Sequence, residues 1–289
     1  MMPNQRAKPT LRRRQLGRML ERCREDAGLT QQAAAASMNW PHHKLSKIEN
    51  ARAHIPAKDV EPYLRKCGVT DEAFILALAN LAKNAAKKGW WAGFGDAILT
   101  TYMDHISVET EATRIRYYAP NLIPGLLQPR NYAREIIRAT GTLVPELVEA
   151  RVDVRTARQA VLTKAERPLD FWTVINESVL HHEFRENPEA MYEQLERLLE
   201  LSQRPTITIQ VMPIRAASHP GLLGLFSLLD FEKPYPSIVQ VEDIRGSSFI
   251  EEDSDVQAFE NAWERIIAAA LPEDRSRELI KKVMEERRS

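Results

Sequence analysis

Residues 29–52, LTQQAAAASMNWPHHKLSKIENAR, constrain the fold of this chain more than any other segment. Thr30 is a good N-cap for a short helix over residues 31–37, which is nearly all alanine and can pack very closely against its neighbours. Asn39 tolerates the left-handed backbone conformation that a tight turn needs. Pro41 suits the first position of a following helix. The segment therefore predicts two short helices joined by a tight turn.

The second of these helices has two distinct sides. Leu45 and Ile48 lie three residues apart, which predicts that both face the core. Ala35 in the preceding helix is small, so the two helices can cross closely there. The outer side, near the helix N-terminus, then presents four polar side chains: His42, His43, Lys44 and Lys47.

Further helices are predicted around this pair. One covers residues 11–27 and is ended by Gly28, as glycine often ends a helix. It carries one apolar stripe: Leu16, Leu20, Cys23 and Ala27. Two more are expected over residues 57–67 and 70–88, the last with Thr70 as its N-cap. The N-terminal part is thus expected to be all-α.

Charge is divided unequally along the chain, although the net charge is zero. Residues 1–66 hold 14 Lys or Arg and 6 Asp or Glu, whereas the rest of the chain holds 26 and 34. A basic module of this size is typical of nucleic-acid binding. An ordinary solvated basic face would give the same counts, so charge alone leaves both interpretations open.

The chain length of 289 residues suggests two domains. GWWAGFGD at residues 89–96 breaks the helical pattern with glycines and offers aromatic side chains for packing between domains. We therefore expect a helix-turn-helix domain over residues 1–70, a connecting helix and junction over 71–94, and an α+β domain over 95–289. The expected sheet of the α+β domain is small and either mixed or antiparallel.

Within the second domain, the apolar pattern predicts helices and strands in alternation. Helices are expected over residues 108–118, 131–138, 145–164 and 273–288, with two further helix starts at Asn187-Pro188-Glu189 and at a capping box, Ser254 to Gln257. Strands are expected over residues 171–176, 206–213, 224–231 and 237–243.

LTQ, a small-residue helix and LSKIEN, at fixed spacing, closely resemble the Xre/phage-repressor family over residues 11–66. The resemblance implies that the second short helix enters the major groove of DNA. Base readout is then expected from His42, His43 and Lys47. Phosphate contacts are expected from Gln31, at a helix N-terminus, and from Lys44, Asn50 and Arg52.

By the same family pattern, Glu49 pairs with Arg24, which would orient that arginine toward the DNA backbone and lock the helices. A surface ion pair of little energetic weight is the alternative. Two positions depart from the pattern. Pro41 replaces the usual Ser or Thr cap, and Ala51 stands where glycine usually ends the helix, although alanine is disfavoured at positive φ.

The second domain resembles a domain found after the helix-turn-helix in a large actinomycete family of regulators. The blocks that carry this resemblance are YYAPNLIPGLLQPRNYA, RTARQAVLT, LERLLELSQRPTITIQVMP and GLLGLFSLLDF. That family is described as similar to antitoxins and is usually encoded beside a small protein. The resemblance implies regulation of a neighbouring gene, with the second domain engaging a small protein or a ligand, and supplies no catalytic residues.

Motifs of enzymes and cofactor sites are missing from the sequence: it has no GxxxxGK[ST], GxGxxG or GxSxG. We expect neither catalysis, a cofactor nor a metal, since the His42–His43 pair points in different directions around a helix. The same holds for residues 181–183, HHE. Cys23 and Cys67 are expected to be reduced core thiols.

No apolar stretch is long enough to cross a membrane, and the basic N-terminus lacks the apolar stretch of a signal peptide. We therefore expect a cytoplasmic, nucleoid-associated protein. Tyr117, Tyr118 and Pro124 are candidates for a ligand pocket, with a rigid proline-rich turn over the sheet as the alternative.

The sequence thus favours a homodimeric, sequence-specific regulator that binds double-stranded DNA, because one recognition helix reads only a few base pairs. The dimer contact is expected on residues 254–271 or on the terminal charged helix. Two alternatives stay open: a protein-interaction scaffold with degenerate DNA binding, and a DNA-tethered enzyme.

Overall fold

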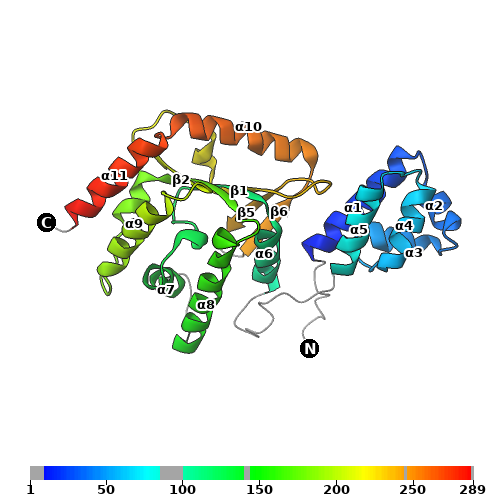
Figure 1. The fold of residues 1–289 in the computed structure, drawn as a ribbon, viewed down its shortest axis with the longest axis horizontal. Helices are drawn as coiled ribbons and strands as arrows, with labels where there is room; N and C mark the ends of the chain where they lie inside the picture. Colours follow the sequence, from blue (N-terminus) through cyan, green and yellow to red (C-terminus); the bar gives the residue numbers. More distant parts are fainter. Residues whose placement is uncertain (1–9, 85–99, 140–143, 244–245, 288–289) are drawn as a thin grey trace. The chain divides into compact units, whose positions relative to one another are not determined.

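The computed structural model describes residues 10–84, 100–139, 144–243 and 246–287. The chain divides into two compact units, residues 1–90 and 91–289 (Figure 1). The junction predicted at residues 89–96, with its tryptophans, lies outside the described residues.

The described part of the first unit is helical. Its helices are α1 (Leu11–Asp26), α2 (Gln31–Ser37), α3 (His42–Glu49), α4 (Ala57–Lys66) and α5 (Glu72–Asn84). Gly28 follows α1 at φ +66°, a left-handed conformation that costs glycine little. α5 begins two residues after the predicted N-cap Thr70, because Asp71 Oδ1 instead accepts hydrogen bonds from the Ala73 and Phe74 N–H groups.

The core of this unit is formed by apolar side chains from its helices. They include Leu16, Leu20, Leu45, Ile48, Val60, Leu64 and Leu78. α5, expected to connect the domains, packs on α1 and α4 and buries Leu78 and Leu81. It is therefore part of the helix-turn-helix unit's own core.

The second unit contains a six-stranded sheet in the order β3-β2-β1-β4-β5-β6. Its strands are β1 (Arg114–Ala119), β2 (Asp170–Asn176), β3 (Ile207–Met212), β4 (Phe226–Asp230), β5 (Ile238–Asp243) and β6 (Gly246–Ile250). β1, β2 and β3 are parallel, whereas β4 runs antiparallel to β1, and β4, β5 and β6 are antiparallel neighbours. The sheet is therefore mixed, and the predicted α+β class is confirmed.

Helices lie on both faces of this sheet (Figure 1). They are α6 (Thr100–Glu111), α7 (Arg130–Ala139), α8 (Pro145–Arg158), α9 (Glu189–Leu201), α10 (Asp253–Ala269) and α11 (Glu273–Glu286). Short 3-10 turns complete the connections: η2 (Gly125–Leu127), η3 (Gln159–Thr163), η4 (Glu177–His181) and η5 (Pro220–Leu223). α10 covers one face, and α6, α7, α8 and α9 lie on the other.

Two sequence expectations in this unit are wrong, and one strand is missed. Residues 108–118 do not form one helix, because α6 ends at Glu111 and β1 follows as a central strand that pairs with both β2 and β4. β6 is not among the predicted strands, since Gly246, Ser247 and Ser248 are weak β formers and the strand depends on pairing with β5. α10 begins at Asp253 after Glu252, which makes no side-chain cap hydrogen bond, so the capping box at Ser254 is not formed.

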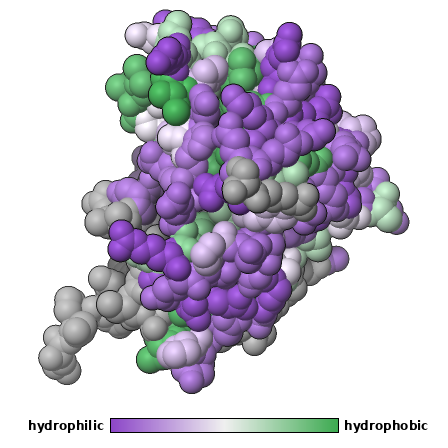
Figure 2. All heavy atoms as spheres, turned by 90° about the vertical axis from the view of Figure 1, so that its left-hand side faces the viewer, coloured by the Kyte–Doolittle hydropathy of each residue, from purple (hydrophilic) through white to green (hydrophobic). Residues whose placement is uncertain are grey.

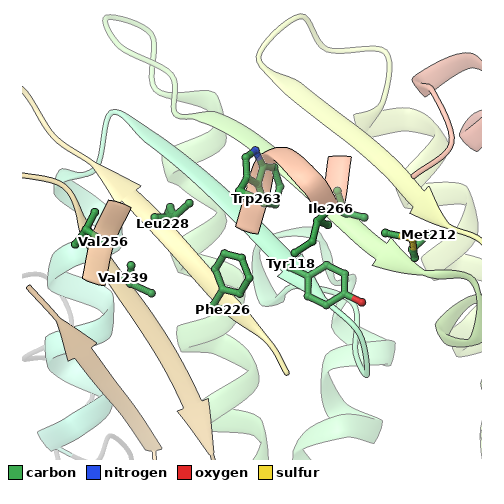
Figure 3. Packing of buried hydrophobic residues seen from close by; sticks show 9 residues of the cluster. Tyr118, Met212, Phe226, Leu228, Val239, Val256, Trp263 and Ile266 are labelled. Carbon is green, nitrogen blue, oxygen red and sulfur yellow. The ribbon is translucent and has the colours of Figure 1, made fainter. Parts of the chain in front are cut away.

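The core between α10 and the sheet is continuous (Figure 3). Trp263 and Ile266 of α10 pack against Tyr118 of β1 and Phe226 of β4, and these side chains are almost fully buried. Since successive strand residues point to opposite faces, the neighbours of these strand residues must lie on the other side of the sheet.

On that other side, α6 and α8 are joined by a buried ion pair. Arg158 donates from Nε to Glu109 Oε1 (2.8 Å) and from Nη2 to Glu109 Oε2 (2.6 Å), and both side chains are about 5% exposed. Burial alone would raise the pKa of Glu109, but the charge and hydrogen bonds of Arg158 outweigh it and lower the pKa to about 2. The carboxylate is therefore ionised wherever the protein is folded near neutral pH.

Replacing Glu109 by Gln should destabilise the second unit by about 3–5 kcal/mol, because Arg158 would stay buried without its charge partner. The loss should be constant above about pH 5 and shrink toward pH 2, since a depressed pKa contributes stability that disappears as the carboxylate is protonated. Urea unfolding across pH measures both effects. Glu196→Gln, an exposed change on α9, is the control, and equal unfolding free energies for the two variants would contradict the expectation.

Candidate nucleic-acid interface

Local backbone chemistry sets the turn between α2 and α3. Thr30 Oγ1 accepts a hydrogen bond from the Ala33 N–H at 3.1 Å, so α2 begins at its predicted cap. Asn39 adopts φ 55°, the left-handed conformation predicted for the turn. After α3, Ala51 adopts φ 56° with its side chain buried. Alanine at position 51 therefore adopts the left-handed conformation in which glycine usually ends this helix.

α3 presents different chemistry on its two sides. Leu45 and Ile48 are at most 2% exposed and fix the helix on the core. His42, His43 and Lys47 are all exposed. The three side chains predicted to read bases are thus all exposed on α3, which Leu45 and Ile48 anchor to the core.

A buried carboxylate joins the helices of this unit. Glu49 Oε1 accepts a hydrogen bond from Arg24 Nε at 2.7 Å, and Glu49 Oε2 accepts one from Gln31 Nε2 at 2.6 Å. The Tyr63 hydroxyl lies 3.3 Å from Glu49 Oε1 and donates to it. The Arg24–Glu49 pair implied by the family resemblance is present, and it is buried, so the surface-pair alternative is wrong.

The ionisation of this cluster follows from its contacts. The hydrogen bond between Arg24 and Glu49 raises the pKa of Arg24. Burial raises the pKa of the Tyr63 hydroxyl, which therefore stays a neutral donor. Removing one member of such a cluster leaves a buried charge without its partner, which costs about 3–5 kcal/mol. The cluster therefore fixes how α1, α2, α3 and α4 pack.

Two side chains that are predicted to contact phosphate form hydrogen bonds within the protein. Arg24 is 6% exposed and also donates from Nη1 to the Leu29 carbonyl at 2.9 Å. This burial leaves its side chain no outward face, so its position does not support a phosphate contact. The side-chain amide of Gln31 is used by Glu49, and a phosphate contact of Gln31 stays a prediction.

The other predicted phosphate ligands lie closer to the surface. Arg52 is exposed. Asn50 is also exposed and donates from Nδ2 to the Ser46 carbonyl at 2.8 Å. Lys44 lies with Nζ 4.0 Å from the centre of the Trp40 ring and 3.9 Å from Asp59 Oδ2. These residues flank the outer side of α3, and their contacts with phosphate stay predictions.

Sequence reasoning missed Gly17, which sits where α1 crosses the end of α3. A Cβ atom at Gly17 would lie 2.4 Å from the Glu49 carbonyl oxygen and 2.9 Å from that of Ile48. Both are backbone atoms and cannot move aside as a side chain could. A lone glycine inside a helical pattern was the available signal.

The predicted ligand-pocket residues separate in the second unit. Tyr117 and Pro124 line a cavity of about 210 Å³ beneath the sheet. Tyr118 belongs to the core under α10, since adjacent residues of a strand point to opposite faces. Including Tyr118 in the pocket was therefore wrong.

In the part of the chain that the structure describes, no group of three or more His, Cys, Asp or Glu side chains could hold a metal ion. Among the same residues, no helix is long and apolar enough to cross a membrane. Cys23 and Cys67 form no disulfide, and burial raises the pKa of both thiols, that of Cys23 to about 11.

Replacing Gly17 by Ala should destabilise the first unit by about 1–3 kcal/mol, because the added methyl group forces α1 away from α3. Amide hydrogen exchange measures this in α1 and α3 separately from the second unit. Gly125→Ala is a matched control, since a Cβ there meets nothing closer than 3.8 Å. Unchanged exchange in α1 and α3 of the Gly17 variant would contradict the close crossing.

Two family matches cover most of the chain. Residues 15–74 match a family described as a helix-turn-helix domain. Residues 102–282, more than half of the chain, match a domain of unknown function, DUF5753. No curated protein and no solved structure matches the chain. The chain therefore belongs to the DUF5753 family, and it carries a helix-turn-helix domain before the domain that defines this family.

Proposed function

We propose that this protein is a sequence-specific transcriptional regulator of the Xre type, whose helix-turn-helix binds double-stranded DNA with α3 in the major groove. The observation that carries the proposal is the exposure of the α3 side chains that are predicted to read bases. His42, His43 and Lys47 are exposed, whereas Leu45 and Ile48 are buried and fix the helix on the core.

These side chains offer the chemistry that base edges require. Lys47 can donate to guanine O6 and N7, and His42 and His43 can donate or accept according to tautomer. Arg52 and Asn50 follow α3 and are exposed, which suits contacts to phosphate that position the helix. The proposal therefore separates three base-reading residues from a surrounding group that binds the backbone.

We further propose that the protein acts in the cytoplasm as a homodimer on two half-sites, regulates a neighbouring gene, and is not an enzyme. The second unit would engage a small partner protein, in the manner of an antitoxin, or a ligand. Figure 2 shows one face that is mainly hydrophilic, with several separate apolar areas. Leu222 and Leu223 are 73% and 95% exposed, and apolar residues of this kind suit a protein contact.

The combined change His43→Ala and Lys47→Ala should weaken binding to the operator by about tenfold or more and relax base preference, because good base contacts contribute about 1–3 kcal/mol each. Gel-shift titrations compare DNA from upstream of the gene with random DNA of equal length. Lys66→Ala removes an exposed charge at the end of α4 and serves as the control. Equal binding of the two DNAs by the wild type would overturn the proposal, and an unchanged double variant would favour the scaffold alternative.

Binding should also weaken steeply with salt. If each subunit neutralises about five phosphates, the logarithm of the binding constant should fall against the logarithm of salt concentration with a slope of about −4.5 per subunit. Arg52→Ala should reduce this slope by about one and leave base preference unchanged, since a phosphate contact carries no sequence information. Fluorescence anisotropy at several salt concentrations measures the slope, and a slope near zero would contradict a phosphate-dependent interface.

A further inference from the structure

The cavity beneath the sheet is lined by parts of the second unit that are distant in sequence. Strands β1, β4 and β5 contribute alternate residues to its roof, among them Tyr117, Ser227 and Gln240. α6, α8 and the segment of residues 120–128 form the other walls. Its volume of about 210 Å³ exceeds that of cavities of about 150 Å³ that bind benzene, so a small organic molecule fits.

The walls divide into an apolar part and a polar end. The apolar part is formed by Ile115, Ile123, Leu126, Ile136, Phe171 and Leu229. The polar end holds Arg155 and Arg158 of α8, whose side chains lie next to Gly125. A Cβ atom added at Gly125 would lie 3.8 Å from Arg155 Nε and Arg158 Nη1.

The two arginines differ in how their charge is compensated. Arg158 is fully engaged: it pairs with Glu109, donates to the Tyr102 hydroxyl and contacts His105 Nε2. Arg155 donates from Nη1 to Gln128 Oε1 at 2.7 Å, but its buried Nε has no hydrogen-bond partner. Among the described residues, no carboxylate pairs with Arg155. A half-buried cation that faces a cavity without a counter-ion favours an anionic ligand.

Tyr117 supplies a second donor at the same cavity. Burial raises the pKa of its hydroxyl, as does the charge of Glu242, so the group stays protonated. In the described part of the chain, no residue forms a hydrogen bond with this hydroxyl. Glu242 itself accepts from Gln240 Nε2 at 2.6 Å, at the side of the cavity formed by β5. A negative group of a ligand should therefore lie at the Arg155 end, where the charge of Arg155 also acts on the Tyr117 hydroxyl.

We propose that this cavity binds a small organic carboxylate with an apolar body. The carboxylate pairs with Arg155 and accepts a hydrogen bond from Tyr117, while the body lies against Phe171 and the other apolar walls. This assignment names the class of ligand for the binding role proposed for the second unit. Only an effect of the ligand on transcription rests on that proposed function. Ligand binding itself is independent of DNA.

Isothermal titration of the full-length protein, without DNA, tests the proposal with phenylacetate and hexanoate as probes. Their neutral amides, phenylacetamide and hexanamide, keep the apolar body and lose the charge, whereas acetate keeps the charge and lacks the body. We expect at least one of the two larger acids to bind at least about tenfold more tightly than its amide and than acetate. No binding by either acid up to about 10 mM, or equal binding of acid and amide, would overturn the proposal.

Variants locate the binding. Arg155→Gln should weaken binding of the acid at least about tenfold and remove the preference over the amide, whereas Arg155→Lys should retain part of that preference. Gly125→Leu should weaken binding of both acid and amide, because its side chain would displace the Arg155 and Arg158 side chains, which a Cβ there already meets at 3.8 Å. Arg167→Gln, a matched change at an exposed ion pair with Glu232, should bind as the wild type does. Wild-type affinity in a folded Arg155→Gln variant would place the ligand elsewhere and overturn the assignment.

Discussion

The carboxylate of Glu49 is the point on which the geometry of the first unit depends. It is buried at the end of α3 and accepts hydrogen bonds from α1, through Arg24, and from α2, through Gln31. Tyr63 reaches the same group from α4. Since a buried carboxylate is costly without partners, these four helices can pack in few arrangements other than the one observed. The direction in which α3 presents its outer side follows from that restriction.

The close crossing of α1 and α3 depends on the absence of a side chain at Gly17. Gly17 lets the backbone of α1 touch the carbonyl groups that end α3, within a distance that no Cβ could occupy. Close backbone contact and the Glu49 cluster act at one place and favour the same register of α1 on α3. Any shift of that register would expose Arg24 or bury it without its partner, so packing and electrostatics reinforce each other.

Much of this first unit was predictable because its determinants are local. A cap at Thr30, a left-handed residue at Asn39 and an inward pair at Leu45 and Ile48 are each readable from a few neighbouring residues. The part played by Gly17 was not, because the atom that a Cβ would meet belongs to a residue 32 positions away, at Glu49. Tyr63 likewise joins the cluster from another helix.

In the second unit, long-range pairing outweighs local preference. Arg114–Ala119 follows a helix directly and could continue it, yet these residues form the strand that pairs with both β2 and β4. Because that segment is a strand, Tyr117 and Tyr118 face opposite sides of the sheet. A helix predicted over these residues could not place the two tyrosines on opposite sides of a sheet. The polar cavity lining also comes from helices and strands far apart in the chain.

Two buried arginine–glutamate pairs, one in each unit, show how similar chemistry serves different ends. In the first unit, the Arg24–Glu49 pair is closed by donors from other helices, and the result is a rigid support for α3. In the second unit, the Arg158–Glu109 pair balances its own charge beside a cavity, but Arg155 lies one helical turn earlier on α8 without an acidic partner in the described residues. A fold that served stability alone would gain by pairing or exposing that guanidinium. Its position at the wall of a cavity fits the proposed ligand, whose negative charge would come from outside the chain.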